Sequence, residues 1–131
     1  MSKVAAVLCG LAMAAGLLVG CATEPSPTAS PEIIALLAES APSQACMLAL
    51  AHGTLVPDPR SGLALAVSGG ERVTVKWPFG YSARIVDGAV ELIDNHGVLV
   101  ARDGDPVVLG GGYGGGDLFY ACSGRVQRAG P

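Results

Sequence analysis

The side chains best suited to chemistry in this sequence are aspartates and one histidine in turn-forming segments. Asp94 and His96 belong to an Asp-Asn-His-Gly turn, and Asp103 and Asp105 share the turn that follows. Oxygen ligands of this kind could gather around a hard cation such as Ca²⁺. Aspartate is also common in turns because its carboxylate accepts hydrogen bonds from nearby backbone N–H groups. These residues lack the spacing of an EF-hand loop, so they remain candidate ligands only, and we expect neither a metal nor another cofactor.

Two other catalytic patterns are absent or incomplete in the sequence. It contains no G-x-S-x-G nucleophile motif. The run from Gly110 to Gly116 includes G-x-G-x-x-G, but a strand-like segment follows it, whereas a dinucleotide-binding fingerprint opens a helix. We therefore predict that this run is a flexible loop linking the last two strands, and that the protein is not an enzyme.

An aromatic corner is the most distinctive binding candidate. Trp77, Phe79 and Tyr81 supply three of the six aromatic residues within five positions, and Arg84 follows closely. Such rings beside a cation could stack on a sugar or another flat ligand, with Tyr113 of the glycine run contributing to the same face. The alternative is that Trp77 and Tyr81 fill a small core while Phe79 covers one end of it.

The N-terminal segment is typical of a secretory signal. Lys3 precedes an uncharged stretch, 4–19, which is shorter than the roughly 20 residues that a permanent membrane helix needs. Leu18-Val19-Gly20-Cys21 resembles the lipobox of bacterial lipoproteins. This resemblance implies that residues 1–20 are a cleaved signal peptide and that lipid on Cys21 anchors the protein at the outer face of the cytoplasmic membrane. The alternatives are an ordinary signal peptide and a membrane helix that ends in cysteine.

The lipoprotein resemblance also bears on the remaining cysteines. Cys9 would leave with the signal peptide and Cys21 would carry lipid, so Cys46 and Cys122 would be an even pair in an oxidising compartment. We expect a disulfide between them. Two unpaired thiols acting as metal ligands are the alternative, although no C-x-x-C pattern supports it.

The elements that must position these residues are read from hydrophobic patterning. Ala22 to Ser30 is rich in Pro, Ser and Thr and predicts a flexible tether. Ser30-Pro31-Glu32 has the residues of a helix start, which predicts a short helix near 31–40 within an anchored segment, 21–45.

The predicted folded domain covers residues 46–124, followed by a C-terminal tail at 125–131. Val73, Val75 and Trp77 alternate with polar residues, as in a half-buried strand, and Gly, Asp and Pro turns recur throughout the domain. Short strands at this spacing, without a long helical pattern, predict an all-β domain. We expect a small, partly open barrel of the oligonucleotide/oligosaccharide-binding (OB) type, with a small sandwich as the alternative.

Three segments of this domain are similar to small secreted or lipid-anchored proteins of actinobacterial type that have no assigned activity. They are His52–Val56, Trp77–Arg84 and Val100–Asp105. The similarity implies a small envelope β domain and transfers no catalytic residue.

These observations favour a non-catalytic binding or interaction module. Its partners would be the membrane, through the lipid anchor, and an envelope protein or glycan. The net charge of −3 over 131 residues disfavours nucleic acid. One alternative is a small-ligand or glycan binder that uses the Trp77–Arg84 corner, and a more distant one is a metal-dependent envelope protein. Exposed corner rings in a concave site would favour the ligand binder, whereas buried rings would favour a protein partner.

Overall fold

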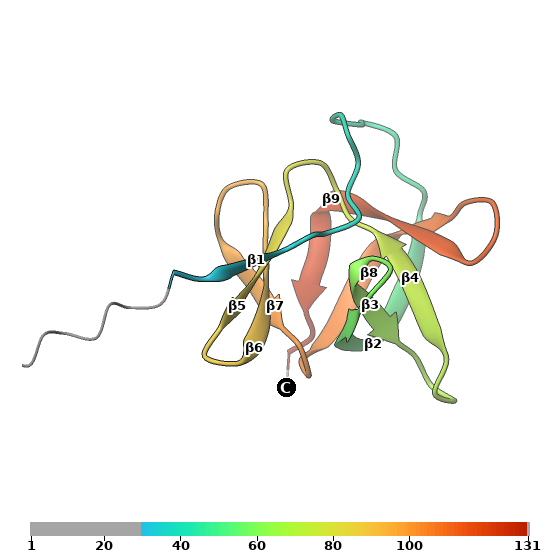
Figure 1. Cartoon of the computed structure of the whole chain (residues 1–131). Coiled ribbons are helices and arrows are strands. Elements are labelled where there is room, and N and C mark those ends of the chain that lie inside the picture. Colours follow the sequence, from blue (N-terminus) through green and yellow to red (C-terminus); the bar gives the residue numbers. More distant parts are fainter. Residues whose placement is uncertain (1–29, 131) are drawn as a thin grey trace, which may run out of the picture. The chain divides into compact units, whose positions relative to one another are not determined.

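The computed structural model describes residues 30–130, and the folded unit within it is all-β (Figure 1). The predicted signal peptide, Cys21 and the tether up to residue 29 lie outside the described residues. The unit that begins at Pro31 is compact and contains the whole core described below. The strands are β1 (Glu32–Ile34), β2 (Ala49–Asp58), β3 (Gly62–Ala66), β4 (Arg72–Lys76), β5 (Ser82–Val86), β6 (Ala89–Ile93), β7 (Leu99–Arg102), β8 (Pro106–Tyr113) and β9 (Leu118–Arg128).

Five strands close into a barrel in the order β2-β3-β4-β9-β8, with β8 pairing back to β2. All these pairs are antiparallel except β4 with β9, which are parallel. In the ring, β9 therefore lies between β4 and β8, although it follows β8 in the chain. This crossed strand order agrees with the predicted OB-like barrel. The ring is closed, whereas the sequence predicted a partly open one.

The closure depends on the glycine run, which is not the predicted loop. Gly110 to Gly112 and Tyr113 extend β8, so this strand is long enough to pair with β2 on one side and β9 on the other. The connection that remains, 114–117, is short. The sequence prediction was wrong because glycine is generally unfavourable in strands. In this barrel, however, neighbouring groups approach the backbone of β8 closely, and glycine leaves room for them.

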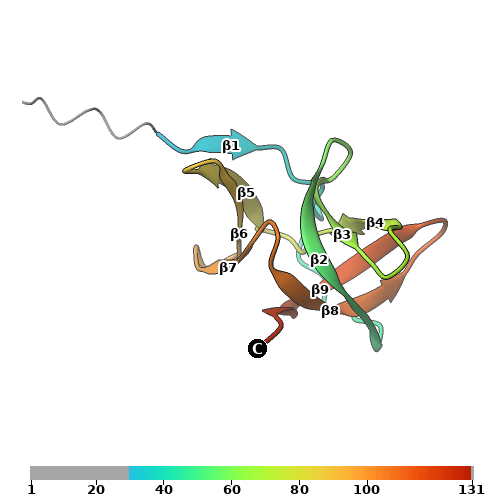
Figure 2. The ribbon, with the colours of Figure 1, turned by 90° about the horizontal axis from the view of Figure 1, so that it is seen from below.

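The second sheet has the order β1-β5-β6-β7; its strands β5, β6 and β7 lie in the chain between β4 and β8, whereas β1 precedes the first barrel strand. Figure 1 and Figure 2 show β5, β6 and β7 together at one side of the barrel strands. Ala83, Leu92 and Ala101 point inward from this sheet and share one core with Leu55, Leu65 and the other buried side chains of the barrel. The two sheets are therefore one hydrophobic unit rather than two domains.

The predicted helix near 31–40 is wrong, because this segment is extended. β1 pairs with β5, Ile33 lying opposite Arg84, and Ala38 forms a bridge with Trp77. The backbone N–H of Leu37 donates to Ser61 O at 3.0 Å, and the N–H of Trp77 donates to Leu37 O at 2.8 Å. A helix of about ten residues is marginal in water. Pairing with the domain satisfies the backbone groups of this segment and places Ile34 and Leu36 against the core.

The folded unit is also longer at its C-terminal end than the sequence predicted. β9 continues through Arg128, which lies opposite Val107, and Val126 is buried in the core. Most of the predicted tail, 125–131, therefore belongs to a barrel strand. No helix within residues 30–130 is long and apolar enough to cross a membrane.

Candidate functional site

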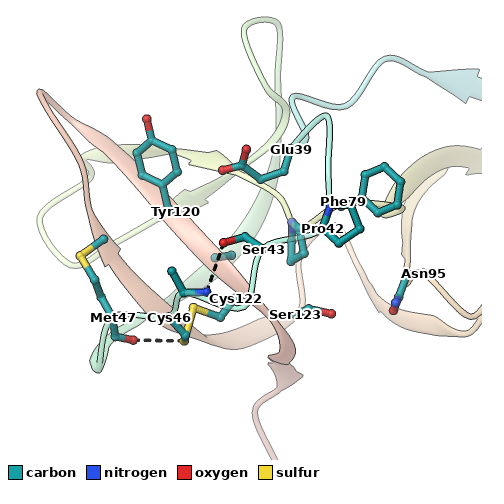
Figure 3. Close-up of a pocket in the computed structure, with 13 residues that line it drawn as sticks. Glu39, Pro42, Ser43, Cys46, Met47, Phe79, Asn95, Tyr120, Cys122 and Ser123 are labelled. Atoms are coloured by element: carbon teal, nitrogen blue, oxygen red, sulfur yellow. Dashed lines mark hydrogen bonds between the residues drawn. A yellow bond between two sulfur atoms is a disulfide. The ribbon is translucent and has the colours of Figure 1, made fainter.

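A pocket of about 620 Å³ lies between the barrel and the segment that precedes β2. We call this segment, residues 39–47, the strap. Figure 3 shows Pro42, Ser43, Cys46 and Met47 of the strap facing Tyr120 and Cys122 of β9, with Phe79 and Asn95 farther along the pocket. The full lining is Glu39, Pro42, Ser43, Ala45, Cys46, Met47, Pro78, Phe79, Asn95, Tyr120, Ala121, Cys122 and Ser123.

The strap is attached at both ends. At its start, the Glu39 N–H donates to Trp77 O at 2.9 Å, and the Glu39 carboxylate lies 3.6 Å from Lys76 Nζ. Near its end, a disulfide joins Cys46 to Cys122 of β9, as the sequence predicted, with the Cα atoms 5.7 Å apart. Between these attachments, the Ala45 N–H donates to Ser43 Oγ at 3.2 Å. The pocket wall is thus a short loop fixed at two points.

Two glycines, Gly112 in β8 and Gly114 in the loop after it, leave room for side chains at one end of the pocket. A Cβ atom on Gly112 would lie 2.6 Å from both Cβ and Sδ of Met47, so Met47 occupies the space that a side chain there would fill. A Cβ atom on Gly114 would clash with the ring of Tyr120. Lys76 Nζ lies 5.7 Å from the centre of that ring, which places a positive charge near the pocket.

The lining is chiefly apolar, with a few polar groups. Rings, a thioether, prolines and the disulfide form most of the wall, and the polar contributions come from Glu39, Ser43, Asn95, Tyr120 and Ser123. Sites for small molecules and for apolar peptide segments have this composition, because apolar contact supplies affinity and a few polar groups fix orientation. The arrangement can hold a ligand by contact and hydrogen bonding.

The structure divides the predicted aromatic corner between the core and the surface. Trp77 and Tyr81 are buried, whereas Phe79 is 44% exposed and lines the pocket. Burial raises the pKa of the Tyr81 hydroxyl, and the nearby charge of Asp94 raises it further, against a lowering hydrogen bond from the Gly124 backbone. The corner is therefore not a flat platform of three rings.

The other two predicted binding residues lie away from Phe79. Arg84 belongs to the second sheet, where its Nε donates to Glu91. Tyr113 is exposed at the end of β8, with its ring edge-to-face on Phe119 at 5.2 Å between centroids. Neither residue lines the pocket.

The carboxylates among the candidate metal ligands accept hydrogen bonds from backbone N–H groups. Asp94 Oδ1 accepts from the N–H groups of His96 and Val98 at 2.8 and 2.9 Å. The Val98 hydrogen bond is the main reason that the pKa of Asp94 lies below its ordinary value, against a raising effect of burial; the His96 backbone and ring lower it further.

The other two aspartates also accept from backbone N–H groups, Asp103 from strand β6 and Asp105 from the start of its own turn. Asp103 Oδ1 accepts from Val90 N at 2.7 Å, and Asp105 Oδ2 accepts from Arg102 N at 2.9 Å. Within residues 30–130, no three such side chains gather in a way that could hold a metal ion.

Sequence reasoning missed most of the pocket. Glu39 was placed in the predicted helix and Pro42 and Ser43 in the rest of the anchored segment, whereas Met47 and Tyr120 were placed in the folded domain with no role in binding. One usable signal was the alternation in β9, since Tyr120 and Cys122 point to the same face of a strand. The predicted disulfide would then have placed Tyr120 near the segment that carries Cys46.

Comparison with known proteins gives no match to a protein-family model, to a curated protein or to a solved structure.

Proposed function

We propose that this protein is an extracytoplasmic lipoprotein, anchored through Cys21, whose β domain is a non-catalytic binding module. The ligand site is the pocket between the strap and β9. The observation that carries this proposal is an apolar pocket of about 620 Å³ whose wall is fixed by a disulfide. A wall attached in this way binds at lower entropic cost than a mobile loop, because less freedom is lost on binding.

The chemistry of the lining indicates the class of ligand. Phe79, Met47, Pro42 and the disulfide offer apolar contact, and the Tyr120 ring offers a face for stacking. Glu39 is the charged residue of the lining, and its carboxylate is already paired with Lys76. We therefore propose a neutral, mainly apolar ligand, such as an apolar side chain of a peptide or a small hydrophobic molecule.

The pocket is tested with N-phenyl-1-naphthylamine, a neutral apolar fluorophore, added to the lipid-free chain of residues 22–131. We expect saturable enhancement of its fluorescence that is weakened by Phe79→Ala and by Tyr120→Ala. Tyr113→Ala is the matched control, because Tyr113 is an exposed ring outside the pocket. Equal binding by the Phe79→Ala variant and the control would contradict this location of the site.

The anchor is tested separately in the expressing cell. Metabolic labelling with a clickable palmitate analogue should mark the protein, and Cys21→Ala should abolish both the label and the membrane fraction. Cys46→Ala is the control for labelling of cysteine in general. An unlabelled wild-type protein would contradict the anchor while leaving the pocket intact as a proposal.

A protein partner is the second candidate, favoured by two exposed leucines beside the pocket. Leu48 is 84% exposed and Leu50, in β2, is 59% exposed; by strand alternation they share one face, and they follow Met47 of the pocket in the chain. Exposed apolar side chains gathered in this way are typical of interaction surfaces. A photo-crosslinking amino acid at position 50 should capture such a partner in intact cells, whereas the same amino acid at Gly69, in the exposed turn between β3 and β4, should not.

A further inference from the structure

Three charged side chains form a row across the outward face of the second sheet. Arg84 in β5 lies opposite Glu91 in β6, and Glu91 lies opposite Arg102 in β7. Arg84 Nε donates to Glu91 Oε1 at 3.0 Å, and Arg102 Nε donates to Glu91 Oε2 at 3.0 Å. We call these three residues the arginine clamp. Their neighbours Ala83, Leu92 and Ala101 face the core, so the clamp faces away from it.

Each arginine in the clamp keeps most of its hydrogen-bonding capacity. A guanidinium has five N–H donors, of which Nε carries one. Among residues 30–130, the side chains of Arg84 and Arg102 have no hydrogen-bond or ion-pair partner other than Glu91. The glutamate side chain is only 5% exposed, whereas the arginine side chains are 41% and 52% exposed. The Nη groups are therefore open to solvent while the carboxylate that orients them is not.

The three side chains of the clamp together carry a net positive charge. The two arginines and one glutamate sum to +1. In the turn after β7, the carboxylate of Asp103 accepts from Val90 N, and that of Asp105 accepts from Arg102 N and lies 3.5 Å from Arg128 Nε. Because one carboxylate fixes both guanidiniums, little side-chain freedom remains to be lost when an anion binds.

We propose that the arginine clamp binds a phosphate-type oxyanion through the Nη groups of Arg84 and Arg102. Guanidinium groups bind phosphate oxygens with paired, charge-assisted hydrogen bonds, and two guanidiniums can share a single phosphate. Glu91 is a positioning residue, because it touches the arginines rather than the ligand. A phosphate monoester in solution and a lipid headgroup share this chemistry. The site is separate from the pocket and does not depend on its proposed ligand.

The test is a titration of the chain of residues 22–131, which includes the whole compact unit, with inorganic phosphate at constant ionic strength. Arginine Nε–Hε signals are followed by NMR. We expect saturable shifts at Arg84 and Arg102. Arg84→Gln should weaken binding about tenfold or more, as the loss of a charge-assisted hydrogen bond does.

Two further variants keep this test decisive. Arg84→Lys retains the charge that faces Glu91 but loses the planar fork, so it should fold and still bind phosphate less tightly. Arg60→Gln is the matched control, an arginine in a turn outside the clamp. The proposal is overturned if phosphate causes no saturable shift, or if Arg60→Gln weakens binding as much as Arg84→Gln.

Vesicles identify the source of the anion. Co-sedimentation with phosphatidylglycerol vesicles that is lost in Arg84→Gln would assign the site to lipid headgroups. Phosphate binding without such co-sedimentation would assign it to a soluble phosphorylated ligand. In both cases the clamp is the anion site.

Discussion

The indole N–H of Trp77 donates a hydrogen bond to the carbonyl oxygen of Leu63, 2.9 Å away in the core. The same oxygen lies 2.8 Å from the hydroxyl of Ser61, whose single proton it shares with the Asp58 carboxylate at the same distance. Trp77 directly follows β4 and Leu63 lies in β3, and the backbone of Trp77 also exchanges hydrogen bonds with Leu37 and Glu39. One residue thus connects the barrel to the start of the strap.

Replacing Trp77 with phenylalanine should lower the free energy of unfolding by about 1–3 kcal/mol, from one lost hydrogen bond and a partly filled cavity. Leu63 O would keep Ser61 as a partner, so its carbonyl would not be left unsatisfied. Urea denaturation measures the effect. Phe79→Leu, at a half-exposed site, should change the same quantity by less than about 0.5 kcal/mol. Similar losses in both variants would argue against this role for Trp77.

The disulfide should contribute strongly to stability, because it joins cysteines 76 positions apart along the chain. The chain-entropy model assigns about 4–5 kcal/mol to a loop of this length. Reduction, or the double variant Cys46→Ser/Cys122→Ser, should lower Tm and release one end of the strap. Fluorophore binding in the pocket should then fall even at temperatures where the barrel stays folded. A reduced protein with unchanged Tm would contradict the first expectation.

Asp58 should make the protein sensitive to acid. Burial works to raise the pKa of Asp58, but hydrogen bonds from the hydroxyl and N–H of Ser61 and from the N–H of Arg60, with the charge of Arg72, lower it below 3.8. The lowered pKa contributes stability that is present above pH 3.8 and is lost as pH falls through the folded-state pKa. Asp58→Asn should flatten the decline in stability below pH 4, measured by urea denaturation at several pH values. A decline as steep as in the wild type would rule out this contribution.

Gly112 should control the position of Met47. Gly112→Ala would push the Met47 side chain away and weaken binding of the apolar fluorophore, whereas Gly115→Ala, whose Cβ would meet no atom within 4 Å, should not. Fluorescence titration of both variants checks this expectation. Equal affinities would show that Met47 is not a necessary part of the pocket wall.

Local sequence signals predicted the strands and turns well. The alternation of Val73, Val75 and Trp77 gave the buried face of β4, and all three side chains are buried. Asp87 and Gly88 are typical residues of a two-residue hairpin turn, and both have positive φ between β5 and β6. These features depend on neighbours in the chain, which is why a single sequence reveals them.

The pocket and the strap could not be predicted in the same way. The cap-like residues Ser30 and Pro31 favoured a helix, but pairing of β1 with β5 decided the conformation. The exposure of Phe79 and the burial of Trp77 depend on where the strap crosses the barrel, and the strap is held by contacts far away in the chain. The glycine run was predicted to be a loop for the same reason. The residues that pack against its glycines, Met47 and Tyr120, belong to other segments of the chain.

β9 pairs with both β4 and β8, and it also carries Cys122. The ring and its covalent link are therefore completed by β9, which follows the other barrel strands in the chain. During synthesis the earlier barrel strands emerge with an open edge. They cannot close into a ring before residues 118–128 have been synthesised. Pairing over such long sequence separations is slow, so a chain truncated within β9 would expose unpaired strand edges and aggregate rather than form a smaller barrel.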